Sequence, residues 1–104
     1  MMVTTTETIA HARVIETLGL VRGNTIRARH VGKDIAAGLR SLIGGEITEY
    51  TKMLAEAREQ SLDRMMEEAR SLGADAVVGV RFSTAYVMSN VAEILVFGTA
   101  VKLE

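Results

Sequence analysis

The side chains best suited to binding a metal are two histidines, His11 and His30. His30 and Asp34 stand four positions apart, so they share a face if that stretch is helical. A zinc site takes three or four protein ligands, and the chain has no cysteine. One chain therefore offers no complete cluster, and a metal site would need copies of these residues to meet around a symmetry axis. The alternative is that both histidines are ordinary surface residues.

A second group of polar residues, Glu46, Tyr50 and Arg58, is spaced like neighbours on a helix. One interpretation is a pocket that combines an acid, a phenol and a guanidinium. The other is structural: Glu46 favours the positive end of a helix, Tyr50 lies in a subunit interface, and Arg58 pairs with a neighbouring subunit. We favour the structural interpretation, because few other titratable groups accompany the three.

Phosphate, nucleic acid and nucleophilic chemistry have less support. Gly44 and Gly45 could present backbone N–H groups to an anion, but the fuller pattern of a phosphate loop is missing and Glu46 would repel the anion. The net charge is −1 and only 4% of residues are aromatic, which argues against nucleic acid as a partner. No Gly-x-Ser-x-Gly elbow is present. We expect no enzyme and no cofactor.

A long helix is predicted from Glu46 to Leu72. The segment has no glycine or proline and is rich in strong helix formers. Gly73 follows it, where a left-handed cap is common. At about 1.5 Å per residue the helix would be roughly 40 Å long, more than a small sheet covers. Its apolar positions recur mostly at steps of three and four, as on a buried face, at Ile47, Tyr50, Leu54, Ala57, Leu62, Met65, Ala69 and Leu72.

Two strands are predicted after the helix. Residues 76–84 and 93–103 are rich in apolar and β-branched residues, and Ser89-Asn90 between them has turn chemistry. A hairpin is the expected result. The two runs are continuously apolar, so both faces of the sheet should be covered, and a second subunit is the simplest cover.

The first part of the chain is predicted in shorter pieces. Val3–Thr6 is a short strand and Ala12–Val21 a longer one. Gly23-Asn24 predicts a turn, followed by an extended piece over Ile26–His30. Asp34–Ile43 predicts a turn or two of helix. The intruding Glu16 leaves the register of the longer strand open.

Composition bounds the organisation of the chain. Its 104 residues fit one domain over 1–104, with 48% hydrophobic and 24% charged residues. The N-terminus lacks a signal-peptide pattern. The longest charge-free stretch, Phe82–Ala92, is too short to span a membrane. We expect a soluble cytoplasmic protein without a membrane partner.

Several short motifs together resemble a known family. They are Thr4-Thr5-Thr6, Gly19-Leu20-Val21-Arg22-Gly23, Ala28-Arg29, Gly44-Gly45-Glu46, Tyr50, Arg58, Glu68-Ala69, Leu72-Gly73-Ala74-Asp75-Ala76-Val77 and Phe97-Gly98-Thr99-Ala100-Val101. The chain resembles the YbjQ-like family of small uncharacterised bacterial and archaeal proteins. The resemblance implies a β-α-β-β unit with extra short strands that join five subunits into a ring. The family is often labelled as heavy-metal-binding.

The prediction is an α+β protein with one long helix on an antiparallel sheet in a ring-forming homopentamer. Its function is predicted to be that of a non-enzymatic oligomeric scaffold, or a binding module for a ligand that the sequence does not name. The alternative is a protein that binds a metal or a small ligand, such as an anion, between subunits.

Overall fold

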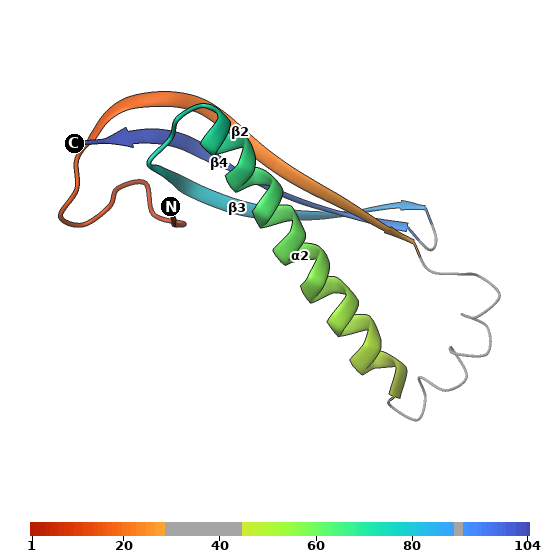
Figure 1. Ribbon diagram of the computed structural model, residues 1–104. Coiled ribbons are helices and arrows are strands. Elements are labelled where there is room, and N and C mark those ends of the chain that lie inside the picture. Colours follow the sequence, from red (N-terminus) through yellow and green to blue (C-terminus); the bar gives the residue numbers. More distant parts are fainter. Residues whose placement is uncertain (29–44, 89–90) are drawn as a thin grey trace.

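The computed structural model describes residues 1–28, 45–88 and 91–104. These residues form one long helix, α2 (Gly45–Ser71), on a sheet of four strands. The strands are β1 (Met2–Val3), β2 (Val14–Ala28), β3 (Ala76–Met88) and β4 (Val91–Leu103), in the order β1-β3-β4-β2 (Figure 1). The expected β-α-β-β unit is confirmed. The sheet is mixed rather than purely antiparallel, because β1 runs parallel to β3.

Helix α2 begins one residue before the predicted start and ends one residue before the predicted end. Its end is set by Gly73, which has a φ of 79°. The N–H of Gly73 donates to the carbonyl of Arg70, and the N–H of Ala74 donates to that of Ala69. This pair of bonds is a Schellman cap. Leu72 lies beyond the last helical residue and is 46% exposed, so its predicted place on the buried face was wrong.

Strand β2 corrects the prediction of a turn at Gly23-Asn24. The chain continues through both residues as one strand of 15 residues that pairs antiparallel with β4. Gly23 lies where α2 crosses the strand: a Cβ there would be 2.1 Å from the carbonyl oxygen of Ser61. Glycine is therefore required for close approach to the helix rather than for a turn.

Two irregularities explain why the register of β2 was hard to predict. Pairing with β4 shifts between Val14 and Glu16 and again between Thr17 and Gly19, and Gly19 has a φ of 126°. Each such bulge adds a residue to one strand and thereby moves later side chains to the opposite face. Beyond the second bulge, Val21 is buried whereas Leu20 is 61% exposed.

The hairpin of β3 and β4 is confirmed, and both strands are longer than predicted. The strands pair antiparallel from Ala76↔Val101 to Met88↔Val91. Three predictions fall wholly or partly outside the described residues: the turn at Ser89-Asn90, the last two residues of the extended piece Ile26–His30, and the helical turns over Asp34–Ile43.

The sheet has an apolar cluster on each face. The cluster under α2 holds Val21, Met65, Ala69, Val77, Val80, Val96 and Ala100. The opposite face carries Ala76, Val78 and Val101, against which Ile9 and Val14 pack. Ile9 belongs to residues 4–13, which we call the N-terminal strap. One face is thus covered by the helix and part of the other by the strap.

The chain is elongated. Its radius of gyration is 17.4 Å, whereas a compact chain of 100 residues has about 13 Å. Figure 1 shows the reason: α2 extends past the sheet at its N-terminal end, and the hairpin extends away from the two chain termini. Among the residues that the structure describes, the outer part of the hairpin therefore extends past the part of the sheet that the helix covers.

Candidate functional site

The outer part of β3 is an extended exposed surface of the sheet. Every residue from Arg81 to Met88 is exposed, whereas the first five residues of the strand are buried or half-buried. We call Arg81–Met88 the open half of β3. The paired strand β4 shows the usual alternation of buried and half-buried residues over nearly the same rows. The difference arises from the position of the helix.

On the face of the sheet where it lies, helix α2 covers the strands near one edge and leaves those near the other edge uncovered. It packs chiefly on β2, less on β4 and hardly at all on β3. Phe82 pairs with Val96, which is fully buried in the cluster under the helix. Directly paired residues share a face. Phe82 therefore lies on the helix side of the sheet, beyond the part that α2 covers, and so does Tyr86, four residues further along the strand.

Among the described residues, the backbone edge of the open half is also unpaired. Strand β1 and the strap follow the edge of β3 only as far as Val80, whose N–H donates to the carbonyl of Thr4. The Arg81 side chain then donates from Nη1 to the carbonyl of Thr5. Within the described residues no strand pairs with this edge beyond that point. Unpaired N–H and C=O groups on an edge are a template for another strand.

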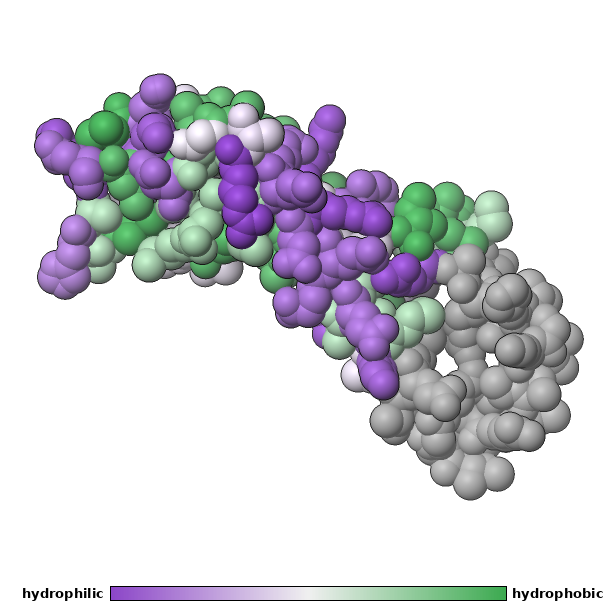
Figure 2. All heavy atoms as spheres, in the orientation of Figure 1, coloured by the Kyte–Doolittle hydropathy of each residue, from purple (hydrophilic) through white to green (hydrophobic). Residues whose placement is uncertain are grey.

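Large apolar side chains accompany this free edge. Phe82 is 47% exposed, Tyr86 73%, Val87 59% and Met88 64%. Figure 2 shows hydrophobic surface gathered at the tip of the hairpin, at the far end of the molecule from the chain termini. Contiguous exposed apolar residues of this kind mark interaction surfaces.

Two buried hydroxyls, on Thr25 and Ser61, fix the helix over β2. Thr25 is 2% exposed and Ser61 is fully buried, and their oxygens are hydrogen-bonded to each other. The carbonyl oxygen of Ala57 lies 2.8 Å from Thr25 Oγ1, and that of Ile94 lies 3.1 Å from Ser61 Oγ, so each of the two hydroxyl protons has an acceptor within reach. Sequence reasoning missed Ser61, because a polar residue interrupts the apolar periodicity. These bonds are structural, since the pair is buried between helix and sheet.

Two further side-chain hydrogen bonds between α2 and β2 lie at the margin of the interface between helix and strand. Arg64 Nη1 donates to the carbonyl of Asn24 at 2.6 Å, and Arg27 Nη2 donates to Gln60 Oε1 at 2.6 Å. Both bonds lie beside the Thr25–Ser61 pair along the strand. The helix is therefore held at several points along β2, and none of the hydrogen bonds described for α2 reaches the open half of β3.

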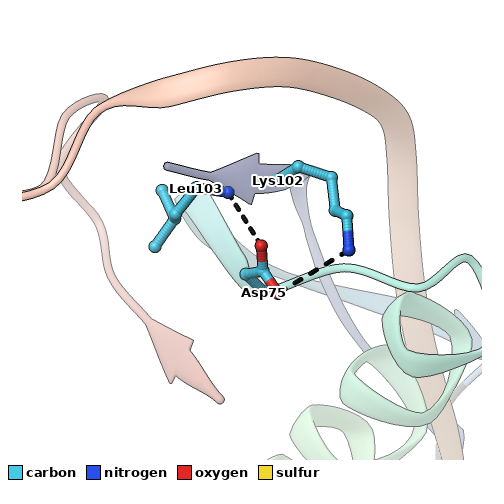
Figure 3. Close-up of polar contacts among 3 residues, drawn as sticks. All are labelled: Asp75, Lys102 and Leu103. Atoms are coloured by element: carbon cyan, nitrogen blue, oxygen red, sulfur yellow. Dashed lines mark hydrogen bonds and ion pairs between the residues drawn. The ribbon is translucent and has the colours of Figure 1, made fainter.

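The carboxylate of Asp75 links the start of β3 to the end of β4. Asp75 follows the helix cap and precedes β3, and its Oδ2 accepts a hydrogen bond from the N–H of Leu103 at 2.8 Å (Figure 3). Its Oδ1 lies 3.8 Å from Nζ of Lys102. The N–H of Asp75 in turn donates to the carbonyl of Val101. Asp75 thereby secures the end of β4 to the start of β3.

Of the predicted site residues, His11 and Arg58 are those whose side chains the structure describes. His11 lies in the strap, is exposed and has a φ of 64°. Arg58 is an exposed residue of α2. Glu46 and Tyr50 lie in the first turns of that helix, but their side chains are outside the described part of the chain, and so are His30 and Asp34.

No metal centre is formed by the side chains that the structure describes. None of them make up a group of three or more His, Asp or Glu residues that could hold a metal ion. A tetrahedral site needs three or four such ligands. Within those residues, a metal site would therefore require ligands from more than one chain.

Comparison with known proteins identifies the family. A family model described as "Putative heavy-metal-binding" matches residues 1–104. The chain belongs to the YbjQ family. A UPF0145 protein of Methanosarcina acetivorans is 59% identical over 103 residues, covering 99% of this chain and 97% of the relative. A UPF0145 protein of Thermus thermophilus is 59% identical over 104 residues, which are all of this chain and 91% of the relative.

A solved structure has the same fold. It is a protein with unknown function of the DUF74 family from Pediococcus pentosaceus, with a TM-score of 0.72 and 15% identity over all of this chain and 98% of the other. At that identity the likeness concerns the fold alone. The YbjQ relatives compared above are not named for any enzymatic activity. Among the described residues, no helix is both long enough and apolar enough to cross a membrane.

Proposed function

We propose that the protein is a non-enzymatic, homo-oligomeric binding module, and that its subunits join through the open half of β3. The observation that carries the proposal is the uninterrupted exposure of Arg81–Met88 in a strand whose first half is a core element. Thirteen-residue strands are long for a domain of this size, and the outer half of β3 extends past the buried part of its own subunit.

The energetics support a partner on this surface. Phe82, Tyr86, Val87 and Met88 retain about half to three quarters of their surface in water. Complete burial of such a side chain stabilises by about 1.5–3 kcal/mol, so finishing their burial contributes roughly 1–2 kcal/mol each. Association costs about 4 kcal/mol or more in lost freedom. Apolar contact therefore offsets that cost, and hydrogen bonds along the free edge would provide the surplus.

The symmetry of a ring supports a particular partner surface. A closed ring of five needs a heterologous contact, in which one surface of each subunit meets a different surface of the next. Within the described part of the sheet, β2 is the outermost strand on the side opposite β1 and β3. Its exposed residues include Ile15, Leu20 and Ile26. We therefore place the open half of β3 against the β2 side of the neighbouring subunit. The number five follows from the resemblance to the family.

Ligand binding between subunits is the other half of the proposal. The description of the family names heavy metals, and the described residues of one chain do not supply a ligand set. Sites shared between neighbouring subunits would combine donors that one chain keeps apart. A cytoplasmic location is part of this proposal and rests on the composition of the chain.

The experiment is native mass spectrometry of untagged protein, combined with two variants. The wild type should give five times the chain mass of 11.3 kDa, and any reproducible added mass would identify the ligand class. F82K/Y86K should reduce the mass to smaller species. L72K is the matched control, because Leu72 and Phe82 are 46% and 47% exposed. A monomeric wild type, or an F82K/Y86K variant that remains fully assembled, would contradict the proposal.

A further inference from the structure

A cavity lies between the N-terminal strap and the sheet face opposite α2. Its volume is about 580 Å³, within the range of small-molecule sites. The strap provides Glu7, Ile9 and Arg13 on one side, and the sheet provides the floor. The helix-side core and the open half of β3 do not contribute to it, whereas Val14 and Thr17 of β2 do, so the cavity is separate from the β3 side of the proposed assembly surface.

The strap is attached at both of its ends, which preforms the cavity. At one end the N–H of Thr4 donates to the carbonyl of Val77 at 3.0 Å, and the N–H of Gly79 donates to that of Thr6 at 2.8 Å. At the other end the N–H of Glu104 donates to the carbonyl of Arg13 at 2.9 Å. A ligand would not have to order this segment, and so would not bear that entropic cost.

The floor of the cavity is apolar with hydroxyls in it. Val78 is 7% exposed and Val101 is 2% exposed, and both line the cavity. Thr17 and Thr99 lie beside them on adjacent strands. Within the part of the chain that the structure describes, neither threonine side chain has a hydrogen-bond partner. The floor thus suits an aliphatic group and offers hydrogen bonds beside it.

Once the ion-pair partner of Arg13 is counted, the charged groups at the cavity carry a net negative charge. Arg13 and Glu7 are the two charged lining residues. Nε of Arg13 lies 2.8 Å from Oε2 of Glu104, so the charge of this guanidinium is already offset. Glu7 has no ion-pair partner among the described residues. The remaining charge at the cavity is therefore negative.

We propose that this cavity binds a small aliphatic molecule that carries a protonated amine. The aliphatic part would lie on Val78 and Val101, and the ammonium group would contact the carboxylate of Glu7. An aliphatic carboxylate of the same length fits the same floor, but it would meet the unpaired charge of Glu7. Preference for the amine over the acid is therefore the property that distinguishes this site from a generic apolar hollow.

The test is titration of the full-length protein with hexylammonium, hexanoate and hexanol, which share one aliphatic chain. Calorimetry should give hexylammonium a dissociation constant on the order of 1 mM, as expected for so small a ligand. Hexanoate should bind more weakly. In E7Q the affinity for hexylammonium should fall about two- to fivefold, the range of an exposed ion pair, with hexanol unchanged. E68Q, which removes an exposed carboxylate from α2, should match the wild type.

Methyl-labelled NMR spectra locate the site. Hexylammonium should shift the methyl signals of Val78 and Val101 and leave those of Val21 and Met65, on the helix side, in place. The proposal is overturned by equal affinity of E7Q and wild type for hexylammonium, by hexanoate binding as tightly as the amine, or by the absence of binding up to 50-fold above the expected constant, roughly 50 mM. Because Glu7 is exposed, E7Q should fold normally, which circular dichroism checks.

Discussion

Replacing Gly23 with alanine tests how the helix is seated on the sheet. The new Cβ would lie 2.1 Å from the carbonyl oxygen of Ser61, 2.6 Å from the amide nitrogen of Met65 and 2.9 Å from Cβ of Arg64. Two of these three atoms are helix backbone, which has no rotamer by which to move aside. Relief therefore requires the whole of α2 to retreat from β2.

The loss of folding stability in G23A follows from this movement of the helix away from β2. An ordinary contact distance is 3.4 Å or more, so the helix must move by about 1 Å near Ser61. A gap of 0.5–1 Å forfeits roughly a quarter to a half of each dispersion contact along the interface. Typical overpacking costs about 1–3 kcal/mol. Because the obstacle here is backbone, and because the buried bond between Thr25 and Ser61 must lengthen too, we expect about 3 kcal/mol or more.

The assay is urea unfolding followed by circular dichroism at one fixed protein concentration, because assembly contributes to apparent stability. G19A is the control. A Cβ at Gly19 meets no atom within 4 Å, and its φ of 126° adds only backbone strain, about 1–3 kcal/mol. A G23A variant that is as stable as the wild type would refute the close approach, and with it the explanation of why glycine stands in the middle of β2.

Three further predictions concern the core, the strand junction and metal binding. L62D should destabilise the chain by several kcal/mol, because Leu62 packs against the helix-side core, and thermal unfolding measures it. D75A should cost about 0.5–1.5 kcal/mol by removing the acceptor of the exposed N–H of Leu103; the matched control is D63A, an exposed carboxylate with no hydrogen bond or ion pair among the described residues. Dialysis against zinc, followed by elemental analysis, should show equal retention in wild type and H11Q/H30Q; loss of metal in the variant would assign the histidines as ligands.

The helix and the hairpin could be predicted from sequence because their signals are local. Helix formers run without a breaker up to Gly73, and the cap that Gly73 makes needs only its own neighbours in the chain. The strands after it are recognisable from β-branched and apolar residues in continuous runs. In each case the residues that determine the element are the residues of the element itself.

The predictions were wrong or incomplete where the environment of a residue is determined by a segment far away in the sequence. Gly23-Asn24 has the composition of a turn, but a helix that begins more than 20 positions later requires glycine there. Ser61 looks like an interruption of the apolar face, yet it is fully buried because Thr25 supplies its partner. The candidate site residues stay a prediction, because four of the six have side chains outside the described residues, and they were chosen by type and helical spacing. That spacing describes neighbours along one helix and says nothing about which surface of the molecule lacks a partner.

The position of the helix also determines where the molecule is left open. Gly23 lets α2 come close to β2, and Thr25 and Ser61 hold it there. A helix centred on the sheet would have covered Phe82 and left the outer strand β2 bare. One glycine and one hydroxyl pair thus move the helix to one side, and the apolar rows of β3 become the surface available to a neighbour. Residues that never touch the proposed interface would in this way decide which strand forms it.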